Sequence, residues 1–159
     1  MEHNYQCLFV IRLRGEVNLR REVEDTLGML HLTRVNHAVI INNRPEYLGM
    51  LNKVKDVVTW GEISKETIMK LIKKRGRLSA GRRFNNEIIK ELGYNSIEDL
   101  AEDIFNVKLE LSKLHKMKPV FRLHPPKGGF KGGTKRSVGE KGELGYRGEE
   151  INNLAQIMI

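Results

Sequence analysis

Hydrophobic and polar positions in the first sixty residues alternate between the period of strands and the period of helices. Three segments predict strands, and the first of them is apolar on both faces at its centre: residues 5–13, 36–43 and 56–63. Two segments place apolar side chains at helical spacing: residues 19–30 after a cap at Asn18, and residues 45–54 after the helix-starting Pro45. This part therefore predicts the order β-α-β-α-β.

The next sixty residues have mainly helical periodicity. Ser64 precedes one helix, residues 84–93 form a second, and Ser96 with Asp99 makes a capping-box pattern before a third. We expect residues 107–117 to continue as helix, although their apolar positions at 107, 109 and 111 also alternate like a strand.

Periodicity fades after Pro119, apart from the apolar stretch at residues 120–123. The apolar residues 151–159 could dock on the body as a strand or a helical turn. The chain is thus expected to be an α+β protein in three parts: a β-α-β-α-β core at 1–62, a helical extension at 63–118, and a basic, glycine-rich arm with an apolar tail at 119–159.

Charge is distributed unevenly along the 159 residues, whose net charge is +8. Residues 113–159 hold ten Lys or Arg against four acids, so this last third carries six of the eight excess charges. Residues 111–139 include no acid at all. Such a run favours a polyanionic partner, with nucleic acid the first candidate and an anionic membrane the weaker one.

Several function classes find little support in the sequence. Cys7 is the only cysteine and no histidine pair has metal-ligand spacing, so neither a disulfide, a metal nor a cofactor is expected. No apolar run has the length of a signal peptide or a membrane span, which favours the cytoplasm. The acids have the arrangement of solvated helix faces, and no catalytic constellation is apparent.

The stretch from 124 to 148 contains eight glycines and six Lys or Arg residues. Gly128 and Gly133 have the interval of a phosphate-binding loop, but Thr134 precedes Lys135 in the reverse of the required order. A disordered linker remains an alternative. We favour an RNA-binding arm, in which exposed bases stack on Phe130, Tyr146 or His124 and the expected phosphate contacts are Lys127, Lys131, Lys135 and Arg136.

A second basic segment carries seven Lys or Arg residues between Lys70 and Arg83. A solvated helix face is the simplest interpretation of its first half. Its second half is a loop of small residues, and there we expect phosphate contacts from Arg77, Arg82 and Arg83. His37, at the entry of the second strand, fits a packing role as well as an RNA contact.

The run "HLTRVNHAVIINNRPEYLGMLNKVKDVVTWGEI", residues 31–63, resembles the signature of the large-subunit ribosomal protein L30 family. The preceding strand with Arg12 and Arg14 fits the same family, and the continuation past strand three is similar to its long archaeal form. The resemblance implies a three-stranded antiparallel sheet (ferredoxin-like) with two packed helices. It also implies binding to large-subunit rRNA near 5S rRNA, with roles for the matching Arg34, Asn36 and Lys53.

These observations predict a structural constituent of the cytoplasmic ribosome, without enzymatic activity or small-molecule substrate, that stabilises folded rRNA beside neighbouring ribosomal proteins. Arg12 and Arg14 are included among its expected RNA contacts. Two alternatives remain open: a stand-alone regulatory module for a small ligand or RNA, and a nuclease.

Overall fold

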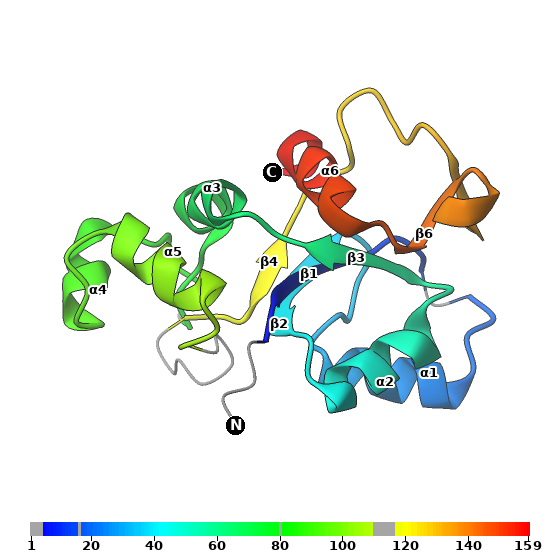
Figure 1. Ribbon diagram of the computed structural model, residues 1–159, viewed down its shortest axis with the longest axis horizontal. Coiled ribbons are helices and arrows are strands. Elements are labelled where there is room, and N and C mark those ends of the chain that lie inside the picture. The colour runs from blue at the N-terminus through cyan, green and yellow to red at the C-terminus, as the bar shows by residue number, and fades with distance from the viewer. Residues whose placement is uncertain (1–4, 16, 80, 110–116) are drawn as a thin grey trace.

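A computed structural model describes residues 5–15, 17–79, 81–109 and 117–159 of the chain. These residues build one mixed sheet with the strand order β4-β2-β1-β3-β6-β5 (Figure 1). The strands are β1 (Cys7–Arg12), β2 (His37–Asn42), β3 (Val58–Glu62), β4 (Val120–Arg122), β5 (Gly133–Ser137) and β6 (Gly142–Tyr146). The class is α+β, as the sequence indicated.

The expectation of a three-stranded sheet is wrong. The three expected strands form an antiparallel centre, β2-β1-β3, but strands from the last third of the chain extend it on both sides. β4 pairs antiparallel with β2, and β6 pairs parallel with β3, with β5 outside it. The stretch that lacked a periodic pattern therefore contributes half of the strands.

Six α-helices lie in the described residues: α1 (Arg21–Met29), α2 (Pro45–Val54), α3 (Lys65–Arg75), α4 (Asn86–Glu91), α5 (Ile97–Phe105) and α6 (Ile151–Met158). Short 3₁₀ turns, η2 (Val138–Glu140) and η3 (Gly148–Glu150), flank β6. The Ser64 and Ser96 hydroxyls accept hydrogen bonds from the third residue beyond, which confirms both predicted caps.

Two local predictions about helix ends are wrong. Asn18 does not cap α1: its φ is +62°, and the helix begins only after Arg20. Nor does α5 continue through Val107, because the helix ends at Phe105 and Val107 has a φ of +59°. Left-handed backbone at these two positions breaks the helical path. Residues 110–116, the middle of the predicted continuation, lie outside the described residues.

Helices cover both faces of the sheet, because the side chains of the central strand are apolar in both directions. Leu8 and Val10 of β1 face α1 and α2, with which they form one core cluster. Phe9 and Ile11 face the opposite way, into a larger cluster with α3, α5 and α6. Figure 1 shows α1 and α2 on one side of the sheet and α3 and α6 on the other.

The last segment docks through a close main-chain approach at Gly61 of β3. A Cβ atom at Gly61 would lie 1.9 Å from the carbonyl oxygen of Gly148, which precedes α6. Asn152 of α6 adds two hydrogen bonds, accepting one from Ser64 N at 2.8 Å and donating one to Glu62 O at 3.1 Å. The apolar tail predicted at residues 151–159 is therefore a helix held directly against the sheet.

Candidate nucleic-acid interface

One end of the sheet gathers charged residues from three neighbouring strands. Val10 of β1 pairs with Val39 of β2, so Arg12 and His37, each two residues along, lie on the same face. Arg122 of β4 pairs directly with His37. Two arginines and a histidine therefore form a row across β1, β2 and β4. We call this row, together with the neighbouring Arg34, the sheet-end cluster.

Arg12 is buried and directed inward. Its side chain is 3% exposed, and its guanidinium donates to Arg14 O at 2.8 Å and to Leu32 O at 2.7 Å. Arg14 is half-buried and donates to Asp56 O at 3.2 Å. Both arginines hold the loops at this end of the sheet, while their contacts with RNA stay a prediction.

Asn36 fixes the main chain at the start of β2. Its φ is +67°, a conformation that asparagine tolerates better than most residues. Its N–H donates to Arg12 O at 2.8 Å, and its carbonyl accepts from Leu123 N at 3.0 Å. The main chain of Asn36 thus joins the ends of β1 and β4. An RNA contact by its side chain is not tested by this geometry.

His37 lies in a positive environment. Burial lowers its pKa from the usual value of 6.5, and the charges of Arg122, Arg34 and Arg12 lower it further, in that order. Arg34 and Arg122 are exposed. Within the described ranges 5–15, 17–79, 81–109 and 117–159, neither of their side chains has an ion pair or a hydrogen bond. Both side chains therefore expose their charge at this end of the sheet.

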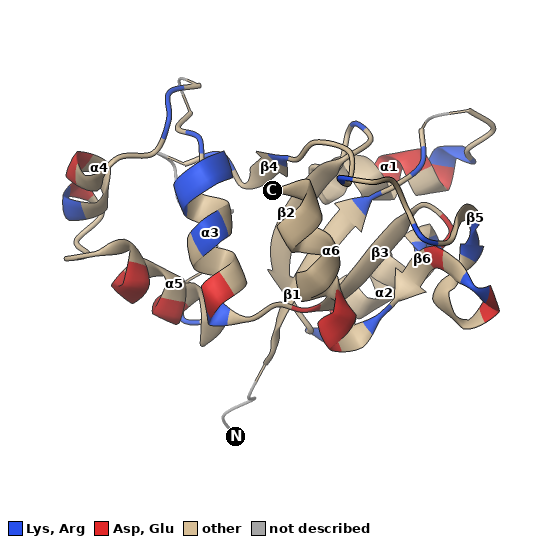
Figure 2. Ribbon diagram, turned by 90° about the horizontal axis from the view of Figure 1, so that it is seen from above, with Lys and Arg blue, Asp and Glu red and all other residues tan. Residues whose placement is uncertain are grey.

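The basic loop after α3 is an ordered turn. Arg77 and Arg83 form a β-bridge, and Leu78 N donates to Arg82 O at 2.8 Å within it. The Arg77 guanidinium bonds to the adjacent Gly76 carbonyl at 3.0 Å, whereas Arg82 and Arg83 are exposed. In Figure 2 the basic end of α3 and the loop beyond it lie on the same side of the molecule as β4.

Lys53 is exposed in the last turn of α2. It precedes Asp56 by three residues, and the Asp56 carbonyl accepts the hydrogen bond from Arg14. Lys53 therefore lies near the same end of the sheet as Arg14.

The cations of the arm extend away from the body. Lys127, Lys131, Lys135 and Arg136 are all exposed, and the last two belong to β5. Only the main chain of Lys127 is tied to the body, through a hydrogen bond from its N–H to Ile157 O at 3.1 Å. The arm thus presents two of the four predicted basic side chains on the edge strand β5 and the other two on the loop before it.

Sequence reasoning missed an internal ion pair in this arm. Glu143 and Arg147 meet at 2.7 Å with side chains that are each 10% exposed. Glu143 also accepts from Gly132 N at 2.8 Å, and Arg147 donates to the Thr59 hydroxyl at 2.7 Å. This network connects the arm to β3, so Arg147 has a structural partner. The (i, i+4) spacing of the pair was visible, but the residues form no helix.

Sequence reasoning also failed to identify Arg122 as a candidate binding residue. It stands alone among apolar neighbours in "VFRL", and only the pairing of β4 with β2 places it beside His37.

The aromatic side chains of the arm differ in their availability. Phe130 packs partly buried against the core, and the ring nitrogens of His124 lie 2.6 Å from Pro125 O and 3.0 Å from Ile159 O. Tyr146 is 55% exposed, and its hydroxyl donates to Glu62. Tyr146 is therefore the most accessible of the three for stacking.

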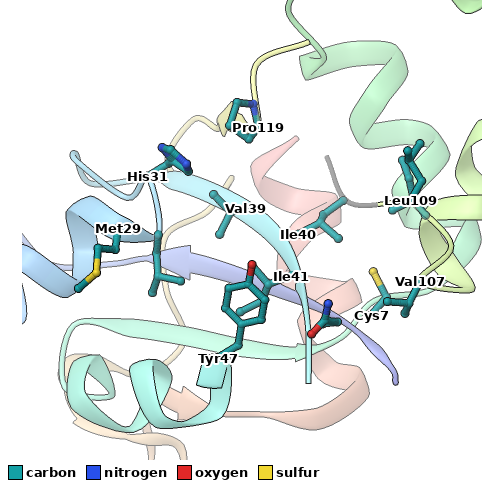
Figure 3. A pocket seen from close by; sticks show the side chains of 13 residues that line it. Cys7, Met29, His31, Val39, Ile40, Ile41, Tyr47, Val107, Leu109 and Pro119 are labelled. Atoms are coloured by element: carbon teal, nitrogen blue, oxygen red, sulfur yellow. The ribbon is translucent and has the colours of Figure 1, made fainter. Parts of the chain in front are cut away.

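A small pocket lies along β2 beyond the end of β4 (Figure 3). Its volume is about 70 Å³, and Val39, Ile40, Ile41 and Tyr47 are among its lining residues. Ligand pockets usually have several hundred Å³. A wider hollow of about 770 Å³ between α3, α4 and α5 has basic, acidic and apolar side chains. If the protein were a regulatory module for a small ligand, this hollow would be the site at which to test ligand binding.

Burial raises the pKa of Cys7 to about 12, so its thiol is a core group, as expected. The described residues contain no cluster of three or more His, Cys, Asp or Glu side chains that could hold a metal ion. None of the helices in this described part is both long enough and apolar enough to cross a membrane.

Comparison with known proteins first defines the class, which is that of ribosomal proteins. Residues 8–58 match the model of the family described as ribosomal protein L30p/L7e. The chain is 48% identical over 151 residues to the large ribosomal subunit protein uL30 of Thermofilum pendens, covering 94% of this chain and 97% of the relative. Identity to uL30 of Methanopyrus kandleri is also 48%, over 92% of this chain and 100% of the relative.

The chain belongs to the ribosomal protein L30p/L7e family. Its relatives are structural ribosomal proteins, so the protein is not an enzyme, as predicted. The similarity extends over residues beyond the region that the family model matches. This confirms the resemblance to the long archaeal form.

Proposed function

We propose that the protein is a structural constituent of the large ribosomal subunit that binds and stabilises folded rRNA through Lys and Arg contacts with phosphates. The observation that carries the proposal is the similarity over nearly the whole length to proteins named large ribosomal subunit protein uL30. Similarity of that extent includes the core, the helical extension and the arm. The net charge of +8 supports a polyanionic partner.

The interface has three parts. The sheet-end cluster lies beside Arg14, Asn36 and Lys53, and the loop with Arg82 and Arg83 follows α3. The third part is the exposed row of cations in the arm. Phosphate contacts position a protein on folded RNA by shape and charge, without reading the bases. Scaffolding of close-packed rRNA is the mechanism that this arrangement serves.

The glycine-rich sequence predicts an arm that orders only against a large anionic surface, but in the structure its strands β5 and β6 are already paired onto β3. Ordering a free chain costs about 1–2 kcal/mol per residue in backbone entropy. Because β5 and β6 are formed in the chain by itself, much of that cost is met during folding. We therefore expect binding to order mainly the long cationic side chains.

The proposed partners include rRNA in the neighbourhood of 5S rRNA and adjacent large-subunit proteins, at the ribosome in the cytoplasm. We further propose that each of the three parts of the chain contributes a different region of the rRNA interface. Residues 1–62 present the sheet end except for Arg122, and residues 63–118 carry the loop after α3. Residues 119–159 supply Arg122 and the arm.

Co-sedimentation tests the proposal directly. The native protein should migrate with large ribosomal subunits in a sucrose gradient and leave them as salt is raised, because released counterions weaken phosphate contacts. Binding of the purified chain to large-subunit rRNA should likewise weaken steeply between 50 and 300 mM KCl. Absence from the large subunit, or binding that salt does not change, would contradict the proposal.

The two alternatives make different predictions. A nuclease would shorten the rRNA during incubation with or without Mg²⁺. A small-ligand module would lose its function when the hollow between α3 and α4 is filled, for example by Met69→Trp, and would not need the arm.

A further inference from the structure

Two exposed cations of the sheet-end cluster, Arg34 and Arg122, lie next to His37. Burial lowers the pKa of His37, and the guanidinium groups of Arg122 in β4, Arg34 in the loop before β2 and Arg12 in β1 lower it further. Among the described residues, no acid is paired with Arg34 or Arg122. Like charges held together in this way repel one another and favour an anion that neutralises them.

We propose that Arg34, His37 and Arg122 together bind a single phosphate group of folded RNA at the end of strands β2 and β4. The inference rests on the proposed function, because it names one phosphate site within the proposed rRNA interface. It adds Arg122, which neither the sequence pattern nor the family motif indicated.

The main chain holds the three side chains in place. Directly opposed residues of antiparallel strands have Cβ atoms about 4.5–5.5 Å apart, which places His37 beside Arg122. Phe121 and Leu123, on either side of Arg122, are both buried. Asn36, between Arg34 and His37, is fixed by its two main-chain hydrogen bonds. The site therefore needs little rearrangement to receive an anion.

The donors suit a phosphate. A guanidinium offers parallel N–H groups that match two phosphate oxygens, and two such groups can approach from either side of the histidine. His37 Nδ1 is buried without a hydrogen-bond partner among the described residues. This favours the neutral tautomer that carries its proton on Nε2, where the N–H can serve as a third donor. Arg12, buried behind the row, adds charge without competing for the ligand.

The test uses the full-length chain and in vitro transcribed large-subunit rRNA with 5S rRNA, and measures Kd from 50 to 300 mM KCl. We expect Arg122→Gln to weaken binding about tenfold and to reduce the slope of log Kd against log salt by about one. Arg34→Gln should behave alike. In the double variant the loss should be smaller than the two losses combined, since both arginines contact one phosphate.

Two further variants distinguish the loss of a specific phosphate contact from the loss of one positive charge in general. Arg122→Lys keeps the charge but not the planar fork, so it should lose part of the affinity while retaining the salt slope. Lys90→Gln, at an exposed position on α4, removes the same charge elsewhere and should change Kd less than about twofold.

The outcomes distinguish the two proposals. Wild-type chain that fails to bind rRNA contradicts the proposed function. Wild-type chain that binds with steep salt dependence, while Arg122→Gln and Arg34→Gln bind equally well, overturns the phosphate site alone. The phosphate site is also overturned if the loss of affinity in the double variant equals the sum of the losses in the two single variants. If urea titration shows that Arg122→Gln folds poorly, the binding of Arg34→Gln and Arg122→Lys tests the site by the same criteria. Arg34→Gln should fold normally, because Arg34 is exposed in a loop.

Discussion

The sheet-end cluster and the arm both present cations, but the two regions hold them in opposite ways. At the sheet end, Arg122 lies between buried neighbours, and Arg12 is itself 3% exposed. In the arm, Lys135 and Arg136 belong to β5, whose residues are almost all exposed. The first region has its charged residues at fixed main-chain positions, whereas the second has charge on a strand with little packing of its own.

The difference indicates that the sheet-end cluster contributes defined contact geometry, whereas the arm contributes general electrostatic attraction. At the sheet end the main chain places Arg34 and Arg122 next to His37, where they can match one phosphate. Long side chains on an exposed strand contribute mainly to the electrostatic field. The arm nevertheless depends on the body, since Gly61 and the Glu143–Arg147 pair dock it on β3. Substitutions at the docking points should therefore affect the arm most strongly.

The largest effect is expected for Gly61→Ala. The new methyl group would occupy the position of the Gly148 carbonyl, so the turn at Gly148 and the start of α6 must move away from β3. We expect the free energy of unfolding to fall by about 4 kcal/mol in urea titration. The control is Gly49→Ala in α2, where nothing lies within 4 Å of the added Cβ and helix propensity should raise stability by up to about 1 kcal/mol. Equal stability of the two variants would contradict the docking geometry.

Glu143→Gln should have the next largest effect. It removes the charge that faces the largely buried Arg147 and weakens the bond from Gly132 N. The expected loss is about 2 kcal/mol, with hydrogen exchange of the amides in β5 and β6 accelerated more than that in β1. A second change, Arg147→Met, should restore part of the loss. Unchanged exchange in β6 would show that the pair does not hold the arm.

The charges of the arm itself should have a moderate effect on affinity. Lys135→Gln combined with Arg136→Gln should weaken binding to rRNA about fivefold at 150 mM KCl and reduce the salt slope by about 1.5. Stability in urea should stay unchanged, because both side chains are exposed. A larger loss than for the single change Arg122→Gln would reverse the proposed ranking of the two regions.

The smallest effect concerns pH. The folded state lowers the pKa of His37 below the 6.5 expected for the unfolded chain, so the unfolded chain binds a proton more readily. This histidine should leave stability unchanged above pH 6.5 and reduce it as pH falls through 6.5 toward the lower folded pKa. His37→Gln should remove that part of the decline. Urea titrations at pH 7.5 and 5.5 would measure it, and the same decline in both proteins would contradict the assignment.

Local signals predicted the core of the fold well. The strands of residues 1–62 and the caps at Ser64 and Ser96 follow from patterns within a few residues. Asn18 had the right chemistry for a cap, but its main chain is left-handed, and no neighbouring residue signals this. Predicted helix boundaries are least reliable at residues such as Asn18, which can either cap a helix or adopt a left-handed turn conformation.

The outer strands could not be predicted, because their stabilisation is not local. β6 has glycines where an alternating pattern would be expected, and it is held by Thr59, whose hydroxyl donates to Gly145 O at 2.8 Å across 86 residues. β4 has only three residues. The family resemblance identified Arg34 as a candidate, and charge alone identified the cations of the arm. Neither could select Arg122, because only the register with His37 gives that residue its neighbour.

The strand order has a consequence for biosynthesis. During translation the three central strands are complete once residue 62 has emerged, but β2 and β3 then have unpaired edges that can join other chains. β4 covers part of one edge and β6 covers part of the other, and both come from the last 40 residues. A nascent chain stalled before residue 120 would therefore carry two open edges. The C-terminal strands thus cover part of both edges through which an unpaired sheet can aggregate.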